Sequence, residues 1–255
     1  MSHGKVAAII PAAGQGVRMG LQKKQFLKLD GIPIFILTLR KLAACPDVTE
    51  LFLACPVDDI AEIETMLSAA GLPKNVTVVA GGSRRQDSVE NCLRSLASDT
   101  DLVAVHDAVR PFVTPALISA VIQEAARSGA AILGVLSVDT VKQVHQTRIT
   151  GTIPRERIVL AQTPQVFRYT ILQQAFAKAR EDSFFGTDEA SLVEHLGLDV
   201  TVVPGSARNI KITTPADLEL ARFFLEQERA APEDGSAVAV AGAGTSPRRS
   251  RKAHG

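Results

Sequence analysis

Short runs of apolar residues alternate along this chain with longer segments in which apolar residues recur at helical spacing. The short runs predict strands at residues 6–10, 50–55, 76–80, 102–105, 130–136, 200–203 and 210–212. The longer segments predict helices at residues 32–44, 58–70, 88–97, from 114 onward, 170–180, 188–195 and 215–229. This alternation predicts an α/β fold whose mainly parallel sheet carries helices on both faces.

Residues 138–159 depart from the alternation. They carry β-favouring residues such as Val141 and Ile149, lack a helical period, and contain a predicted turn around Thr150-Gly151. The segment therefore predicts an extended β-hairpin arm. Because a lone hairpin is only marginally stable in water, we expect the arm to lie against a second subunit.

Composition narrows the class of protein. Hydrophobic residues make up 46% of the 255 residues and aromatic residues only 4%, so aliphatic side chains must fill the core. The formal net charge of +1 gives no general attraction to nucleic acid or to a membrane surface. No apolar run approaches the roughly 18 residues of a membrane helix, and we expect no leader before the first strand. We expect neither nucleic acid nor a membrane as a partner.

The cysteines and the C-terminal segment refine this interpretation. Cys45, Cys55 and Cys92 form no closely spaced pair, which favours reduced, buried thiols and a cytoplasmic protein. From residue 230 the composition shifts to Ala, Gly, Ser and Pro. We expect a folded domain over residues 1–229 and a disordered basic tail over residues 230–255, solvated rather than bound to nucleic acid.

The first predicted strand ends at Pro11 and opens into a glycine-rich loop. Its glycines are Gly14, Gly16 and Gly20, and its cations are Arg18, Lys23 and Lys24. Glycines allow backbone N–H groups to approach an anion closely, so the loop predicts a site for a nucleoside triphosphate. The loop lacks the ending of a Walker A motif, and Met19 stands where a dinucleotide fingerprint needs its third glycine. A glycine-rich turn with solvated basic residues is the alternative.

Two further polar clusters follow predicted strands. Residues 81–88, GGSRRQDS, predict either a second ligand loop or a tight turn with an Asp/Ser helix cap. Residues 106–111, HDAVRP, place Asp107 where it could bind a metal or a ligand hydroxyl, and Arg110 where it could hold a phosphate or fix Asp107. A structural Asp–Arg pair is the alternative, and His106 is interpreted as structural. Ligands bind outside the carboxyl ends of strands in such sheets, which favours a functional role.

These motifs resemble those of the cytidylyltransferases that act on 2-C-methyl-D-erythritol 4-phosphate. The resemblance rests on P-A-A-G-x-G-x-R-M with K-Q-F, GG-x-x-R-x-D-S, H-D-A-x-R-P, T-P-Q at 163–165, T-D-E-A-S at 187–191 and N-I-K-I-T at 209–213. The motifs run in the family's order over residues 11–217. Two departures are Lys23, where the family usually has Pro, and Ser83, where relatives often have an acidic residue.

The resemblance implies a Rossmann-like nucleotidyltransferase sandwich with a β-hairpin dimerisation arm. It implies transfer of CMP from CTP to 2-C-methyl-D-erythritol 4-phosphate in a homodimer, with Mg²⁺ bridging the triphosphate and no direct protein ligand to the metal. The catalytic residues that it implies are Arg18, Lys24, Arg155 and Lys211. Nucleotide-binding residues would be Ala12, Ala13, Gly14, Gly16, Gly82, Ser83, Ser88, Asp107 and Ala108. Acceptor-binding residues would be Arg110, Thr140, Thr163 and Thr187.

Three other functions remain open at this stage. A cytidylyltransferase for another polyol phosphate, such as ribitol 5-phosphate, would share the nucleotide half of the site. A non-catalytic nucleotide-binding module could use the same fold, although binding alone would not need all four catalytic cations. An NAD-dependent oxidoreductase is the most distant alternative, and it would require NADH binding.

Overall fold

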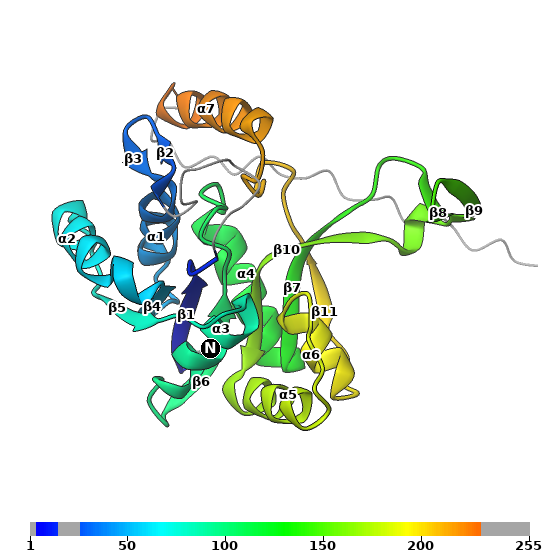
Figure 1. Cartoon of the computed structure of the whole chain (residues 1–255), viewed down its shortest axis with the longest axis horizontal. Helices are drawn as coiled ribbons and strands as arrows, with labels where there is room; N and C mark the ends of the chain where they lie inside the picture. The colour runs from blue at the N-terminus through cyan, green and yellow to red at the C-terminus, as the bar shows by residue number, and fades with distance from the viewer. Residues whose placement is uncertain (1–3, 15–25, 231–255) are drawn as a thin grey trace, which may run out of the picture.

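The computed structural model describes residues 4–14 and 26–230, and within them the core is one seven-stranded sheet (Figure 1). Its strands lie in the order β11-β7-β10-β6-β1-β4-β5. Their bounds are β1 Lys5–Pro11, β4 Glu50–Cys55, β5 Val76–Ala80, β6 Thr100–Val105, β7 Ala130–Leu136, β10 Val159–Arg168 and β11 Thr201–Pro204. Strand β1 pairs in parallel with β4 and β6, β4 with β5, and β7 with β11, which confirms the mainly parallel sheet.

Strand β10 is the antiparallel member, and the sequence did not predict it. It pairs with both β6 and β7, and its register shifts between Ala161 and Gln165. Pro164 lies inside this shift. Proline has no N–H to donate to a β-ladder, so a proline within a segment argues against a strand there. Pro164 is the reason that the sequence pattern did not predict β10.

Helices cover both faces of the sheet, as predicted. Their bounds are α1 Ile34–Ala44, α2 Ile60–Ala70, α3 Arg85–Arg94, α4 Pro115–Ser128, α5 Tyr169–Glu181, α6 Glu189–His195 and α7 Pro215–Ala230. One core cluster joins the sheet to α1, α2 and α4, and a second joins its other face to α3, α5 and α6. Strand β1 feeds both clusters because successive side chains point to opposite faces: Ile10 packs in the first and Ile9 in the second.

Most predicted helices appear near their expected bounds. The helix expected at 32–44 begins at Ile34, because Ile32–Pro33 forms the short strand β3 with β2, Lys28–Leu29. The helix expected at 58–70 begins as a 3₁₀ turn, η3, over Val57–Asp59. The helix expected to run to about residue 97 starts at Arg85 and ends at Arg94.

The predicted strand at 210–212 is wrong, because these residues form irregular backbone. Ile212 donates its N–H to Val109 O at 3.0 Å, and its side chain is fully buried. It packs in a third cluster that joins α7 to β2 and to Phe112. Apolar content here therefore reflects packing beneath α7 rather than membership of the sheet.

The hairpin arm is present, with β8 at Val141–His145 and β9 at Arg148–Ile153, and Figure 1 shows it projecting from the sheet. Its turn lies at Gln146-Thr147, where Gln146 has φ 53°, and not at Thr150-Gly151 as predicted. Val138, Val144 and Ile149 are 81%, 58% and 65% exposed. Val144 and Ile149 are neighbours across the two strands, and exposed apolar side chains of this kind are typical of an interaction surface. The second subunit stays a prediction.

Two sequence-level expectations can be compared with the described residues. Cys45, Cys55 and Cys92 are free and buried, as expected. Burial raises the pKa of the Cys55 thiol to about 11. Across residues 4–14 and 26–230, none of the helices combines the length and apolar character needed to traverse a bilayer.

Candidate active site

Two loops meet beyond the carboxyl ends of β1 and β5. Ala12 donates its N–H to Ala54 O at 2.7 Å, and Gly81 donates to Cys55 O at 2.8 Å. A Cβ atom on Gly81 would lie 2.3 Å from that of Ala13, so only glycine allows the two loops to touch. The structure thus brings Ala12, Ala13 and Gly14 to the second loop, whereas Gly16, Arg18 and Lys24 lie outside the described residues.

The loop at 81–88 is held by its own polar side chains. Ser88 Oγ accepts from Gly82 N–H at 3.1 Å and donates to Arg84 O at 3.0 Å. The Asp87 carboxylate accepts from Ser83 Oγ at 2.8 Å and from Arg84 N–H at 3.0 Å, which caps α3. The capped turn that sequence analysis offered as an alternative is therefore present. The Ser88 hydroxyl is buried, and both of its hydrogen bonds are made to the backbone of this loop.

Asp107 lies at the centre of a cluster of cations. Its Oδ1 is 3.4 Å from Arg85 Nε, while its Oδ2 is 2.9 Å from Lys211 Nζ and 3.4 Å from Arg110 Nε. Burial alone would raise the pKa of Asp107, but these three positive charges hold it well below its usual range. The carboxylate is therefore ionised at any physiological pH.

Local contacts bring Lys211 and Arg110 to Asp107. The Asp217 carboxylate accepts from the N–H groups of Thr213 and Thr214 at the start of α7, which fixes the end of the 209–213 segment. Arg110 Nη1 donates to Asn209 O at 2.7 Å. The Lys211 side chain keeps 43% exposure, against 11% for Arg110. Lys211 is thus the cation of this pair with more freedom to meet a ligand.

His106 and Thr163 support the same loop from below. Thr163 Oγ1 accepts from Asp107 N–H at 3.0 Å and lies 3.0 Å from His106 Nδ1. His106 Nε2 lies 3.1 Å from Arg110 O, which can only accept, so Nε2 carries the proton and Thr163 donates to Nδ1. His106 is structural, as the sequence analysis held, and the Thr163 hydroxyl is committed to the loop.

We expect His106 to make folding stability depend on pH. Complete burial lowers the pKa of His106 to about 4 from its ordinary 6.5. Between these two pH values, His106 is protonated in the unfolded chain but stays neutral in the folded chain. Stability is then lost as pH falls from about 6.5 to about 4. At pH 4.5 the loss from this residue is about 2 to 3 kcal/mol.

Urea unfolding of the natural chain and of His106→Gln at pH 7 and pH 4.5 measures this contribution. The glutamine amide can donate to Arg110 O but does not titrate. We expect the natural chain to lose more free energy of unfolding between the two pH values than the variant does. Equal losses in the two proteins would contradict the prediction.

Pattern analysis did not assign Arg85, Gln165 or Glu189 to the site. Arg85 Nη1 donates to both oxygens of Glu189, at 2.6 and 2.9 Å, and Glu189 is 1% exposed. Gln165 donates to Asp188 Oδ2 at 2.8 Å and accepts from Ala190 N–H at 3.0 Å. All three stand inside quoted motifs, which was the available signal. From the sequence alone, however, Glu189 and Arg85 resemble the ordinary charged residues found at the ends of helices.

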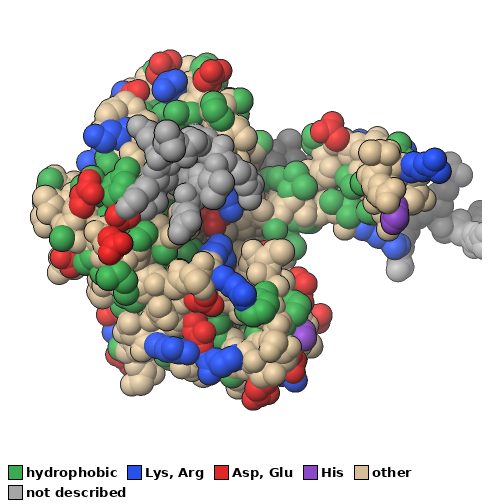
Figure 2. Space-filling model, in the orientation of Figure 1, with side chains coloured by type: hydrophobic (Ala, Val, Ile, Leu, Met, Phe, Trp, Pro, Cys, Tyr) green, Lys and Arg blue, Asp and Glu red, His purple; other side chains and the backbone are tan. Residues whose placement is uncertain are grey.

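A cavity of about 220 Å³ joins these elements. It is lined by Arg85, Asp107, Arg110, Ala161, Gln162, Thr163, Gln165, Thr187, Asp188 and Lys211. Figure 2 shows basic and acidic side chains beside one another at the centre of this face. Predicted residues Arg110, Thr163, Thr187 and Lys211 are therefore brought together with Asp107.

Two predicted site residues, Arg155 as a catalytic residue and Thr140 as an acceptor-binding residue, lie elsewhere, on the arm. Arg155 belongs to the 3₁₀ turn η4, Arg155–Arg157, and donates through Nη1 to Val138 O at 2.9 Å. Its side chain is 57% exposed, and Thr140 is exposed as well. Neither residue lines the cavity of its own chain.

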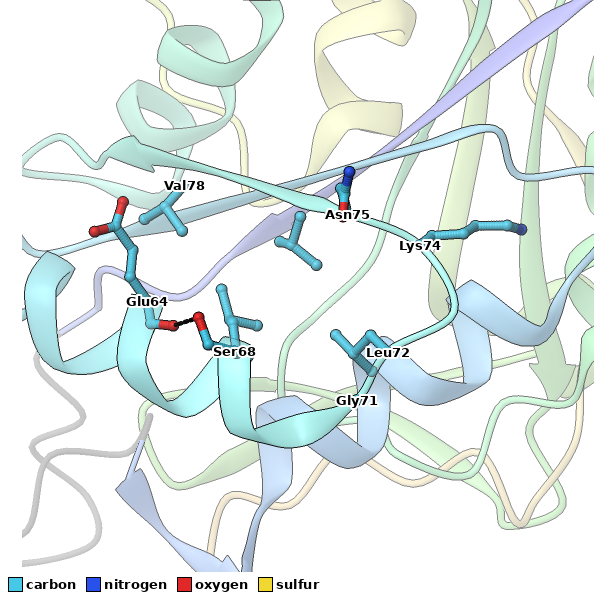
Figure 3. A pocket seen from close by; sticks show the side chains of 9 residues that line it. Glu64, Ser68, Gly71, Leu72, Lys74, Asn75 and Val78 are labelled. Carbon is cyan, nitrogen blue, oxygen red and sulfur yellow. Dashed lines mark hydrogen bonds between the residues drawn. The ribbon is translucent and has the colours of Figure 1, made fainter.

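A second depression, of about 530 Å³, lies between α2 and β5 (Figure 3). Its walls mix aliphatic side chains such as Leu67 and Leu72 with the polar side chains of Glu64, Ser68 and Asn75. The Lys74 ammonium donates to the carbonyls of Cys45 and Val48, both at 2.6 Å, and so is committed to the backbone. This depression lacks the converging charges of the Asp107 cavity.

The fold and the cavity define the class of protein. Solved structures with the same α/β nucleotidyltransferase fold include 4-diphosphocytidyl-2C-methyl-D-erythritol synthase from Anaerococcus prevotii, with a TM-score of 0.78 and 30% identity over 88% of this chain and 99% of that one. The 2-C-methyl-D-erythritol 4-phosphate cytidylyltransferase of Thermus thermophilus gives a TM-score of 0.71 and 35% identity over 87% and 99%. The chain is thus an α/β nucleotidyltransferase.

Sequence comparison identifies the family within this class. The family model described as 2-C-methyl-D-erythritol 4-phosphate cytidylyltransferase matches residues 6–227, and the chain belongs to that family. The family's protein from Solibacter usitatus is 52% identical over 238 residues, which cover 89% of this chain and 98% of that protein. The protein from Acidobacterium capsulatum is 51% identical over 234 residues, 88% and 98% of the two chains.

Proposed function

We propose that this protein transfers CMP from CTP to 2-C-methyl-D-erythritol 4-phosphate. The products are pyrophosphate and 4-diphosphocytidyl-2-C-methyl-D-erythritol, in the non-mevalonate route to isoprenoid precursors. Membership of the family supports the reaction. The observation that carries it is the cavity where Asp107, Arg110 and Lys211 converge beside the two glycine loops, because it offers cations to an acceptor phosphate next to a nucleotide site.

The chemistry asks for positioning more than for proton transfer. An acceptor phosphate oxygen attacks the α-phosphorus of CTP, a new P–O bond forms, and the bond to the β-phosphate oxygen breaks as pyrophosphate leaves. The nucleophile is already anionic near neutral pH, so no general base is needed. Catalysis then consists of alignment and neutralisation of charge. A histidine base is absent from this account, consistent with the buried, neutral His106.

The acceptor half would use the cavity and a second subunit. Lys211, now paired with Asp107 and 43% exposed, would turn its ammonium toward the acceptor phosphate. Arg110 and Thr187 would line the site, with Thr163 holding the loop beneath. Arg155 would come from the arm of the other subunit of a homodimer, because in its own chain it lies outside the cavity.

The nucleotide half would use both glycine loops. Ala12, Ala13, Gly14 and Gly16 would present backbone N–H groups to the triphosphate, and Gly82, Ser83 and Ser88 would form the cytidine side. Asp107 and Ala108 would border the ribose. Arg18 and Lys24 would stabilise the pentacoordinate phosphorus and the departing pyrophosphate.

Mg²⁺ would enter with the triphosphate. Among residues 4–14 and 26–230, no group of three His, Cys, Asp or Glu side chains converges as a metal site, and Asp107 already faces three cations. We therefore expect the triphosphate oxygens to hold Mg²⁺, which would offset their negative charge. The same proposal places the enzyme in the cytoplasm.

Pyrophosphate release in the presence of CTP and Mg²⁺ tests the function. We expect turnover with 2-C-methyl-D-erythritol 4-phosphate and little with ribitol 5-phosphate. Turnover of ribitol 5-phosphate alone would keep the nucleotide site but overturn the acceptor assignment. Absence of turnover with both, together with retained CTP binding, would favour a non-catalytic nucleotide-binding module.

A further inference from the structure

Arg85 joins three parts of the chain at the floor of the Asp107 cavity. It lies in the first turn of α3, its Nη1 donates to both Glu189 oxygens at the start of α6, and its Nε lies 3.4 Å from Asp107 Oδ1. The planar guanidinium has several donors in a fixed fork, so it can serve two carboxylates at once. The cluster therefore ties α3, α6 and the segment after β6 to one side chain.

The two oxygens of Asp107 face different partners. Oδ1 faces Arg85, whereas Oδ2 faces Lys211 at 2.9 Å and Arg110 at 3.4 Å. A carboxylate held by one oxygen presents the other in a fixed direction. The contact with Arg85 thus determines where the Asp107 oxygen that holds the Lys211 ammonium lies.

Neutralisation of charge does not by itself require this contact. Arg85 has Glu189, and Asp107 has Lys211 and Arg110, as other partners of opposite charge. Besides its share in lowering the pKa of Asp107, the Arg85–Asp107 contact therefore has a geometric consequence.

The neighbours of Arg85 fix its position from both sides. The Arg84 guanidinium lies over the Phe185 ring, 3.6 Å from its centroid. Gln86 donates to Phe184 O at 3.4 Å and accepts from Gly186 N–H at 3.1 Å. These contacts hold the start of α3 against the segment that leads into Thr187, so Arg85 has little freedom to follow a displaced partner.

We propose that Arg85, anchored by Glu189, is a positioning residue that orients Asp107 and, through it, Lys211. The inference rests on the proposed function for its kinetic consequence, because Lys211 is the group that would meet the acceptor phosphate. Arg85 itself touches neither substrate in this scheme. Misplacement of a reacting group by about 1 Å costs about 100-fold in rate, which sets the expected effect of losing Arg85.

A double-mutant cycle separates positioning from simple neutralisation. With CTP saturating, we expect Arg85→Gln to lower kcat/KM for the acceptor about 100-fold. Glu189→Gln, whose amide oxygen can still accept from Arg85, should lose less than about tenfold. The double variant should remain as slow as Arg85→Gln. Recovery of the double variant to natural activity would overturn the inference, because it would show that Arg85 only neutralises a buried carboxylate.

Two further variants control for folding and charge. Arg94→Gln removes an exposed arginine from the same helix, where it pairs with Glu90, and should keep natural kinetics. Arg85→Lys keeps the positive charge, but one ammonium lacks the fork that holds both carboxylates. We expect Arg85→Lys to unfold near the natural Tm and to be nearly as slow as Arg85→Gln. Full activity of Arg85→Lys would contradict an orienting role.

Two readings do not depend on turnover. Calorimetric CTP affinity of Arg85→Gln should fall by far less than about 100-fold, because Asp107 would make only one of several contacts to CTP, whereas Lys211 would lie on the acceptor half. A crystal structure of Arg85→Gln should show a rotated Asp107 carboxylate and a Lys211 ammonium displaced from its present position. An unmoved Asp107 and Lys211 would overturn the inference, even if the proposed acceptor proved wrong.

Discussion

Replacement of Lys211 by Ala should lower kcat by about 100- to 1,000-fold while CTP affinity changes little. Lys211 is the most exposed of the three cations around Asp107 and lines the cavity in which we place the acceptor. Its loss removes a charge that would hold the attacking phosphate in line. Asp107 keeps Arg85 and Arg110 as partners, so no uncompensated buried charge is left.

Steady-state kinetics with each substrate varied, together with calorimetric CTP binding, measure this effect. Lys178→Ala is the matched control, because Lys178 lies on α5, outside the cavity lining, and pairs with Asp182, the residue that follows this helix. We expect the control to behave as the natural chain. If Lys211→Ala raised only the KM for CTP and left kcat intact, Lys211 would belong to the nucleotide half and our assignment would be wrong.

The second large effect concerns the arm. Arg155→Ala should abolish most activity, by about 100-fold, because the guanidinium would hold the acceptor phosphate from the other subunit. Within one chain this side chain is exposed, donates to Val138 O and lies 3.9 Å from the carboxylate of the neighbouring Glu156. A role in catalysis therefore requires that a second copy brings it to a cavity.

A mixed dimer of Arg155→Ala and Lys211→Ala subunits tests this arrangement directly. If Arg155 acts across the interface, one site of the mixed dimer carries both changes and the other carries neither. Purified mixed dimers should then show about half of the natural activity, although each parent is nearly inactive. If Arg155 acts within its own chain, both sites are defective and the mixed dimer stays inactive. Arg148→Ala, on strand β9 of the arm, is the control for the loss of an arm arginine.

Most elements of the sheet followed from local patterns. The run at 130–136 and the helix that follows the Thr114 cap appear where the sequence placed them, because side-chain period and capping chemistry are properties of a few neighbouring residues. Strand β10 did not follow, because Pro164 interrupts it and its partners β6 and β7 come from distant parts of the chain. A strand was wrongly predicted at 210–212, because Ile210 and Ile212 are apolar for packing beneath α7 and not for pairing in the sheet.

Prediction of the site likewise succeeded where local sequence was enough and failed where distant parts of the chain meet. Motif residues at strand ends, such as Asp107 and Arg110, were found because strand ends can be read locally. The contacts that each side chain makes at the site could not be predicted from neighbouring residues. The Thr163 hydroxyl forms hydrogen bonds with His106 and with the backbone N–H of Asp107, and neither partner is near Thr163 in the sequence.

The sequence by itself determined most of the strands and helices along the chain, the placement of polar motifs beyond the strands, and the family. These depend on hydrophobic period, turn chemistry and residue identity, which are written along the chain. Only the tertiary structure decided which charges meet. Arg85 and Glu189 are 104 positions apart, and the folding of α3 and α6 onto one face of the sheet is what makes them partners. Long-range pairing of this kind arises from packing, and no local pattern encodes it.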